Sequence, residues 1–117
     1  MDVQNFYSMI EADGAVVLER FMGNKNLLIK FLKKFLADNN FQALSEALEA
    51  DDYEKALVAS HTLKGVSGNL GLAPLFQYSS EIVTAIREER LKDIAPAFEQ
   101  LRVQYEKIIL LIKELES

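Results

Sequence analysis

The sequence predicts an all-α fold, an up-and-down four-helix bundle with additional short N-terminal and connecting helices. Apolar residues recur at steps of three and four through most of the 117 residues, which is the spacing of one buried helix face. The connections between these segments are short, and no segment alternates apolar and polar residues as a half-buried strand does. Half of the residues are hydrophobic, which is ample for one core. We therefore expect a single helical domain over residues 1–117.

Two short helices are expected before the bundle. Residues 3–11 carry apolar side chains at helical steps, and Asp2 can cap their start. Residues 15–21 form another short helical stretch, which Gly23 and Asn24 end. We expect both pieces to lie across one end of the bundle as a lid.

Four longer amphipathic segments supply the bundle. They are expected at about 26–38, 52–69, 73–88 and 93–115. Between the first two, residues 41–50 form a shorter amphipathic helix. This helix either continues the preceding one after a kink at Asn39 and Asn40 or turns back as a connector, and the sequence leaves both arrangements open.

The last segment has the most regular repeat. Its apolar residues alternate steps of four and three: Ile94, Phe98, Leu101, Tyr105, Ile108, Ile112 and Leu115. Such a seam packs along neighbouring helices at a shallow angle, with Asp93 as the candidate cap. A coiled-coil dimer is the alternative. We favour a monomer, because the other helices need this seam to bury their own apolar faces.

The segment around His61 holds the only histidine of the chain. At about 100° per residue, His61 falls roughly opposite a buried face. That face is formed by Ala56, Ala59, Leu63, Val66 and Leu70. Three residues fall within about 60° of His61 on the same projection, namely Lys64, Gly65 and Gly68.

Glycine in the middle of this helix indicates a functional constraint. It costs about 0.8–1 kcal/mol relative to alanine, so Gly65 suggests that another surface must approach the backbone closely. Fraying of the helix is the ordinary alternative. That alternative fits Gly71, which lies just past the last helical residue, but not Gly65, because the apolar repeat continues to Leu70.

This segment resembles the signature of histidine-containing phosphotransfer (HPt) domains, which carry A-H-x-L-K-G near the middle of a helical bundle, followed by small residues and another glycine. The matching residues are His61-Thr62-Leu63-Lys64-Gly65-Val66-Ser67-Gly68-Asn69-Leu70-Gly71. The family's helical layout fits nearly the whole chain. The resemblance implies a phosphorelay phosphocarrier, in which His61 accepts a phosphoryl group from a receiver-domain aspartate and passes it to another receiver. The implied partners are response-regulator receivers, with a hybrid sensor kinase as a further candidate.

Lys64 is the expected charge partner of the phosphoryl group. It lies three residues after His61, a neighbouring position on a helix. Its ammonium can offset an added charge of about −1.5 to −2, and an ordinary solvated lysine is the alternative. Apolar residues that project on or near the His61 side suggest a docking patch together with Gly65 and Gly68. They are Leu57, Val58 and Leu72, although single exposed apolar residues are also common.

One further role stays open. In some family members a polar side chain from the following helix orients the imidazole. Gln77, Ser79 and Ser80 are candidates by type, and Ser79 lies on the predicted inward face of its helix. The motif assigns the role to none of them.

Composition excludes several other functions. The chain has no cysteine, which excludes disulfides and thiolate chemistry, and one histidine makes a metal site improbable. A formal charge of −5 argues against nucleic-acid binding. No apolar run approaches a membrane span, and the N-terminus has no signal-peptide pattern, so we expect a cytoplasmic protein.

Two functions from different classes remain. The glycines have neither the G-x-G-x-x-G order nor a Walker motif, so we expect no kinase activity, no cofactor, and magnesium only on the partner receiver. The first function is that of a phosphocarrier. The alternative is a non-catalytic helical binding module that docks on a receiver domain without phosphotransfer, whose natural mark would be loss of the histidine.

Overall fold

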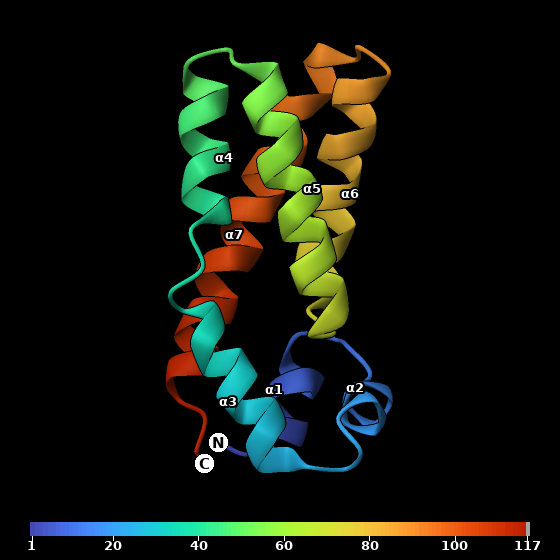
Figure 1. Ribbon diagram of the computed structural model, residues 1–117, viewed down its shortest axis with the longest axis vertical. Coiled ribbons are helices and arrows are strands. Elements are labelled where there is room, and N and C mark those ends of the chain that lie inside the picture. The colour runs from blue at the N-terminus through green and yellow to red at the C-terminus, as the bar shows by residue number, and fades with distance from the viewer. Residues whose placement is uncertain (117) are drawn as a thin grey trace.

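The computed structural model describes residues 1–116, which form an elongated molecule of 40 × 21 × 19 Å. In chain order its elements are α1 (Val3–Met9), α2 (Gly14–Arg20), α3 (Lys25–Phe35), α4 (Asn40–Glu49), α5 (Tyr53–Asn69), α6 (Ala73–Arg87), the 3₁₀ turn η1 (Leu91–Asp93) and α7 (Ile94–Lys113) (Figure 1). No strand occurs within residues 1–116. The predicted all-α class is confirmed.

The bundle consists of α5, α6, α7 and a first position that α3 and α4 occupy one after the other. α5 packs between α4 and α6, and α6 packs against α7. α3 and α4 follow one another along the same side of the molecule (Figure 1). The arrangement that continues the helix after a kink is therefore the one observed.

The expected first helix at 26–38 was too long. α3 ends at Phe35, and α4, rather than α3, packs against the histidine helix. The break has a local cause, since the Asp38 carboxylate accepts a hydrogen bond from the Asn40 backbone N–H at 2.9 Å and so favours a new helix start.

The apolar seam of α7 is covered by its own chain. Ile94, Leu101, Ile108, Ile112 and Leu115 are buried. The half-buried rings of Phe98 and Tyr105 stack on Phe41, with centroids 5.4 and 4.1 Å apart respectively. Intramolecular packing therefore accounts for the seam. Asp93 precedes α7 but makes no side-chain capping bond, because its carboxylate pairs with Arg90.

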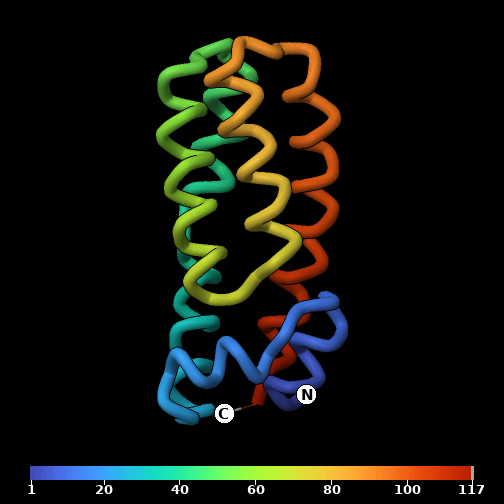
Figure 2. Tube along the Cα trace, turned by 90° about the vertical axis from the view of Figure 1, so that its right-hand side faces the viewer, coloured from blue at the N-terminus to red at the C-terminus, as the bar shows by residue number. Residues whose placement is uncertain are grey.

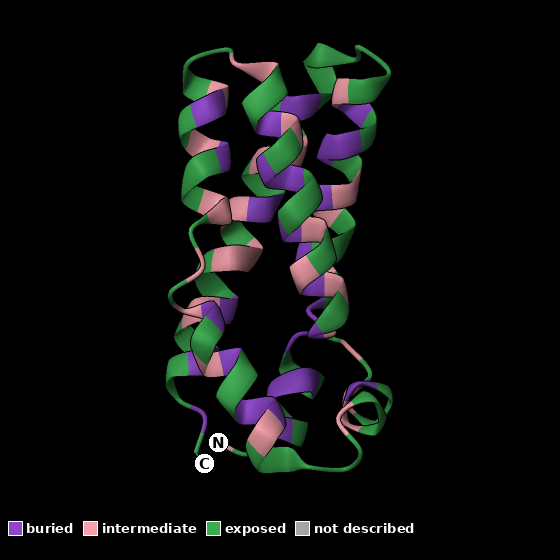
Figure 3. Cartoon of the chain, in the orientation of Figure 1, coloured by how far each residue is buried: buried purple, intermediate pink, exposed green. Residues whose placement is uncertain are grey.

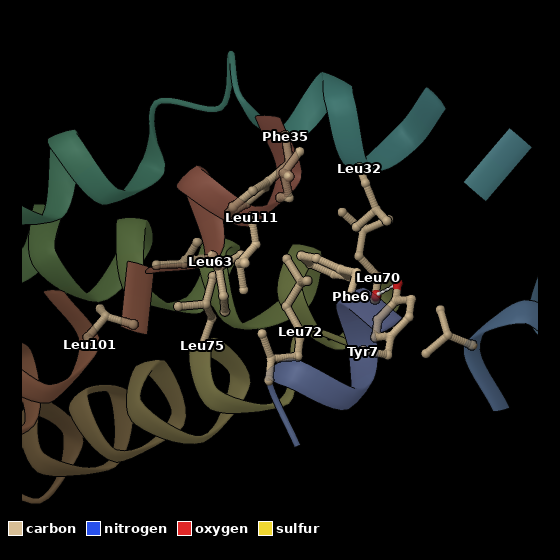
Figure 4. Packing of buried hydrophobic residues seen from close by; sticks show 14 of the residues in the cluster. Phe6, Tyr7, Leu32, Phe35, Leu63, Leu70, Leu72, Leu75, Leu101 and Leu111 are labelled. Atoms are coloured by element: carbon tan, nitrogen blue, oxygen red, sulfur yellow. Dashed lines mark hydrogen bonds between the residues drawn. The ribbon is translucent and has the colours of Figure 1, made fainter. Parts of the chain in front are cut away.

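The N-terminal helices close one end of the bundle, as expected. α1 and α2 lie beneath the turn that joins α5 to α6 (Figures 1 and 2). Phe6 and Tyr7 of α1 are fully buried beside Leu70 and Leu72, as the close view in Figure 4 shows. None of the helices in the described part of the chain combines the length and apolar character that crossing a bilayer requires.

Candidate functional site

The histidine helix α5 begins at a side-chain cap and buries a face of small residues. The Asp52 carboxylate accepts a hydrogen bond from the Lys55 backbone N–H at 3.1 Å, which satisfies one free donor of the first turn. Ala56, Ala59 and Leu63 are buried as predicted, and Val66 is half-buried. Buried and exposed residues alternate along α5 at helical spacing (Figure 3).

Two serines that the periodicity did not single out also lie on the buried face. The hydroxyls of Ser60 and Ser67 donate to the carbonyl oxygens of Ala56 and Leu63, each at 2.7 Å. Their polar groups are thus satisfied within α5. Small, internally satisfied side chains allow α4 and α6 to pack on either side of this helix.

His61 lies on the exposed side of α5. One turn later, a Cβ added at Gly65 would meet no atom within 4 Å outside the local helix backbone. Gly65 has an ordinary helical backbone, because it is not among the residues with positive φ. The imidazole therefore stands beside a stretch of bare, accessible helix.

Lys64 extends toward α6. Its Nζ atom lies 5.9 Å from the ring centroid of Phe76, within the range of a cation–π interaction. The same ring covers Gly68, where an added Cβ would lie 3.0 Å from Phe76 Cδ2. Gly68 is therefore explained by a neighbour inside the molecule, unlike Gly65. Phe76 was not predicted from the sequence, where its only signal is an aromatic residue outside the inward face of α6.

A model of the Hpt domain family matches residues 30–115. The chain belongs to the Hpt domain family. Hpt domains are phosphocarriers of two-component phosphorelays and exchange phosphoryl groups with receiver domains. Comparison with curated proteins and with solved structures returned no match.

The three apolar residues predicted to form the docking patch of this Hpt domain differ in how exposed they are. Val58 is 67% exposed and Leu57 is half-buried. Leu72 is fully buried in the core, so its assignment to an exposed patch was wrong. The prediction continued the helical projection past the end of α5, whereas the chain turns at Gly71, with φ +68°, and directs Leu72 toward Leu75 and the lid (Figure 4).

Three residues of the lid, Tyr7, Val17 and Arg20, contact the C-terminal end of the histidine helix. The buried Tyr7 hydroxyl donates to the Leu70 carbonyl at 2.6 Å. Arg20 Nη1 donates to the Gly68 carbonyl at 2.8 Å, and Val17 packs against Gly71. All three lid residues lie outside the part of the chain that the Hpt family model matches.

Burial keeps the central lid residue, Tyr7, protonated at higher pH than an exposed tyrosine. It raises the pKa of Tyr7 well above its ordinary value, and the nearby Arg20 opposes this only in part. The phenol therefore remains a hydrogen-bond donor into the alkaline range, where an exposed tyrosine would ionise.

Two of the three candidates for orienting the imidazole have other partners in this Hpt domain. Ser79 is buried, as predicted, and its hydroxyl donates to the Leu75 carbonyl of its own helix. The Ser80 hydroxyl donates to the Phe76 carbonyl at 2.6 Å, and Gln77 is exposed. Across residues 1–116, no group of three histidine, cysteine, aspartate or glutamate side chains is placed to hold a metal ion.

Proposed function

We propose that this Hpt domain carries a phosphoryl group on His61, which it accepts from the aspartyl phosphate of one receiver domain and passes to another. The observation that carries the proposal is an exposed imidazole opposite the buried face of α5, with open space over Gly65 one turn later. A receiver must bring its aspartate within bonding distance of the ring, and a bare helix surface permits that approach.

The chemistry needs little from this chain beyond a positioned nucleophile. The lone pair of an unprotonated ring nitrogen forms a bond to phosphorus while the bond from phosphorus to the aspartate oxygen breaks. The electron pair leaves on the aspartate carboxylate, and the other ring nitrogen retains its proton. Transfer to the next receiver is the reverse of this step. The Lys64 ammonium offsets the charge that the phosphoryl group brings to His61.

The docking surface is expected to extend from His61 toward α4. A groove of about 600 Å³ lies between α4 and α5 and reaches Val58. Its floor includes the small residues Ala43, Ala47 and Ala59. The groove, with exposed Val58 and half-buried Leu57 nearby, gives the proposed receiver a concave, partly apolar surface to dock on.

The direct test is transfer of labelled phosphate. The protein is mixed with a receiver domain that has been phosphorylated by a small-molecule phosphodonor, and the label is followed onto this chain. We expect acid-labile, base-stable label, which is lost in His61→Gln while the helical circular dichroism is retained. Undiminished label on His61→Gln would refute the assignment.

Two further results distinguish the other functions. Binding of the receiver without any label on the wild-type protein would support the non-catalytic binding module instead. Label from ATP and magnesium alone, in a preparation free of other kinases, would indicate an enzyme rather than a carrier.

A further inference from the structure

Phe76 is a large aromatic residue that the core does not bury. It lies in the first turn of α6, where its side chain is 41% exposed. The ring is nevertheless held closely, since an alanine Cβ at position 68 would lie 3.0 and 3.2 Å from two of its carbon atoms. Only a residue without a side chain lets the ring lie this close to the backbone of α5.

The backbone that carries the ring is also well hydrogen-bonded. The carbonyl oxygen of Phe76 accepts hydrogen bonds from the hydroxyls of Ser80 at 2.6 Å and Ser79 at 3.3 Å. These bonds lie within α6, which packs closely along α5. The ring thus forms a wall between the two helices over Gly68, which lies two turns after His61 on the same face of α5.

Within residues 1–116, Lys64 is the only cation that lies over the ring of Phe76. Its ammonium lies 5.9 Å from the ring centroid, near the outer limit of about 6 Å for such contacts. A lysine side chain is long and flexible, and its position is otherwise weakly restricted. Since the ring uses only its face, the N–H donors of the ammonium remain free for an anion.

We propose that Phe76 is a positioning residue, which confines the Lys64 ammonium to the side of α5 next to His61 before the phosphoryl group arrives. The proposal rests on the phosphocarrier function proposed above. Lys64 and His61 are three residues apart and so are neighbours on the helix surface. A cation already held there loses less conformational freedom when it pairs with the phosphoryl group.

The first measurement needs no phosphate. In the NMR spectrum of the unmodified protein, the ring current of Phe76 should shift the ε-methylene protons of Lys64 upfield. The shift should persist in Phe76→Tyr and disappear in Phe76→Leu, with the rest of the spectrum unchanged. Lys64 methylene signals that do not respond to Phe76→Leu would overturn the contact.

The second measurement follows phosphoryl exchange with a phosphorylated receiver domain. Phe76→Leu should reduce the equilibrium level of phosphohistidine and its rate of formation about two- to fivefold, the range expected for one exposed cation–π contact. Phe76→Tyr should restore both. In the double variant Lys64→Ala/Phe76→Leu, the loss should equal that of Lys64→Ala alone, because the ring acts through the lysine.

The chain offers a matched control. Lys34 Nζ lies 5.3 Å from the ring centroid of Phe31 on α3, and Phe31 is about as exposed as Phe76. Phe31→Leu should leave phosphoryl exchange unchanged, because this pair lies away from His61. An equal loss in Phe31→Leu would mean that Phe76→Leu acts through general stability.

The outcomes separate the positioning role of Phe76 from the phosphocarrier function of His61. Losses that multiply in the double variant would show that Phe76 acts independently of Lys64, which overturns the positioning role. Normal wild-type transfer with no effect of Phe76→Leu overturns that role alone. Absence of label on the wild-type protein refutes the phosphocarrier function itself, and with it any role in positioning Lys64 for phosphate.

Discussion

The middle of α5 and its C-terminal end use the same residue type for opposite purposes. A side chain added at Gly65 would enter open space, whereas one added at Gly71 would come within 2.0 Å of Val17 Cγ2. Gly65 has ordinary helical geometry, and Gly71 has φ +68°. The first glycine leaves the helix accessible from outside, and the second lets the chain turn tightly under the lid.

This contrast separates function from stability along a few turns of one helix. Substitutions in the middle are expected to change transfer with little effect on folding. Substitutions at the end are expected to change folding first. Four measurements test this division, and the first has the largest expected effect.

Gly71→Ala should destabilise the protein by about 3 kcal/mol. A left-handed backbone costs a non-glycine residue about 1–2 kcal/mol, and overpacking against Val17 adds about 1–3 kcal/mol. Urea unfolding measures the loss. In a Val17→Ala background the added loss should be smaller, since the contact with Val17 Cγ2 is gone and the backbone strain remains with a closer than usual contact at Cβ, 3.2 Å away. A variant within 0.5 kcal/mol of the parent would contradict the tight contact.

Gly65→Gln should be as stable as the parent or up to about 1 kcal/mol more stable. Its side chain would project beside His61 and hinder the receiver, and a displacement of about 1 Å at a reacting centre can cost about a hundredfold in rate. Gly65→Ala should be more stable than the parent by up to about 1 kcal/mol, with a smaller loss of rate than Gly65→Gln. Thermal melting and single-turnover transfer measure both properties. Unchanged transfer by Gly65→Gln would refute the close approach.

Tyr7→Phe should lower the free energy of unfolding by about 1–2 kcal/mol at neutral pH, because the buried Leu70 carbonyl loses its donor. The contribution of Tyr7 to stability also depends on pH. The pKa of Tyr7 is raised in the folded state, so above the ordinary value of 10.0 the unfolded chain releases a proton that the folded protein keeps. Stability therefore falls as the pH rises above about 10.

Tyr7→Phe should reduce this alkaline loss, and urea titrations between neutral and alkaline pH measure it. Some loss should remain, because burial and Asp38 raise the pKa of Tyr105 as well. Parallel alkaline slopes in parent and variant would argue against a buried, protonated Tyr7.

Arg20→Ala should have the smallest effect, about 0.5 kcal/mol, because an exposed cation at a helix C-terminus contributes about 0.3–1 kcal/mol. Arg20→Lys should recover part of the loss, and high salt should reduce the difference between parent and variant. A loss of several kcal/mol would mean that the lid depends on Arg20 more than its exposure indicates.

The helical periodicity predicted the features that repeat along a helix. It located the buried face of α5, the exposed position of His61 and the seam of α7, because each depends on regular spacing. It wrongly placed Leu72 on the exposed side, since helical spacing no longer applies beyond the end of α5. The break between α3 and α4 also depends on a local hydrogen bond at Asp38, which no apolar repeat reports.

The contacts that surround the candidate site were beyond sequence reasoning for a different reason. Tyr7, Arg20 and Phe76 reach α5 from other helices, so their roles depend on tertiary packing. The sequence alone does not distinguish an exposed phenylalanine that contacts a lysine from any other phenylalanine on the surface. The expected docking role of Leu57 and Val58 stays a prediction until a receiver is bound.

The contacts of the lid also imply an order of folding. Tyr7 and Leu70 are 63 residues apart in the sequence, and Arg20 and Gly68 are 48 apart. In contrast, α4, α5 and α6 each pack against the next main helix along the chain, so these contacts close short loops and form quickly. We expect the helical hairpins to assemble first and the N-terminal segment to dock last. In native-state hydrogen exchange, α1 and α2 should then open at a lower free energy than α5, α6 and α7.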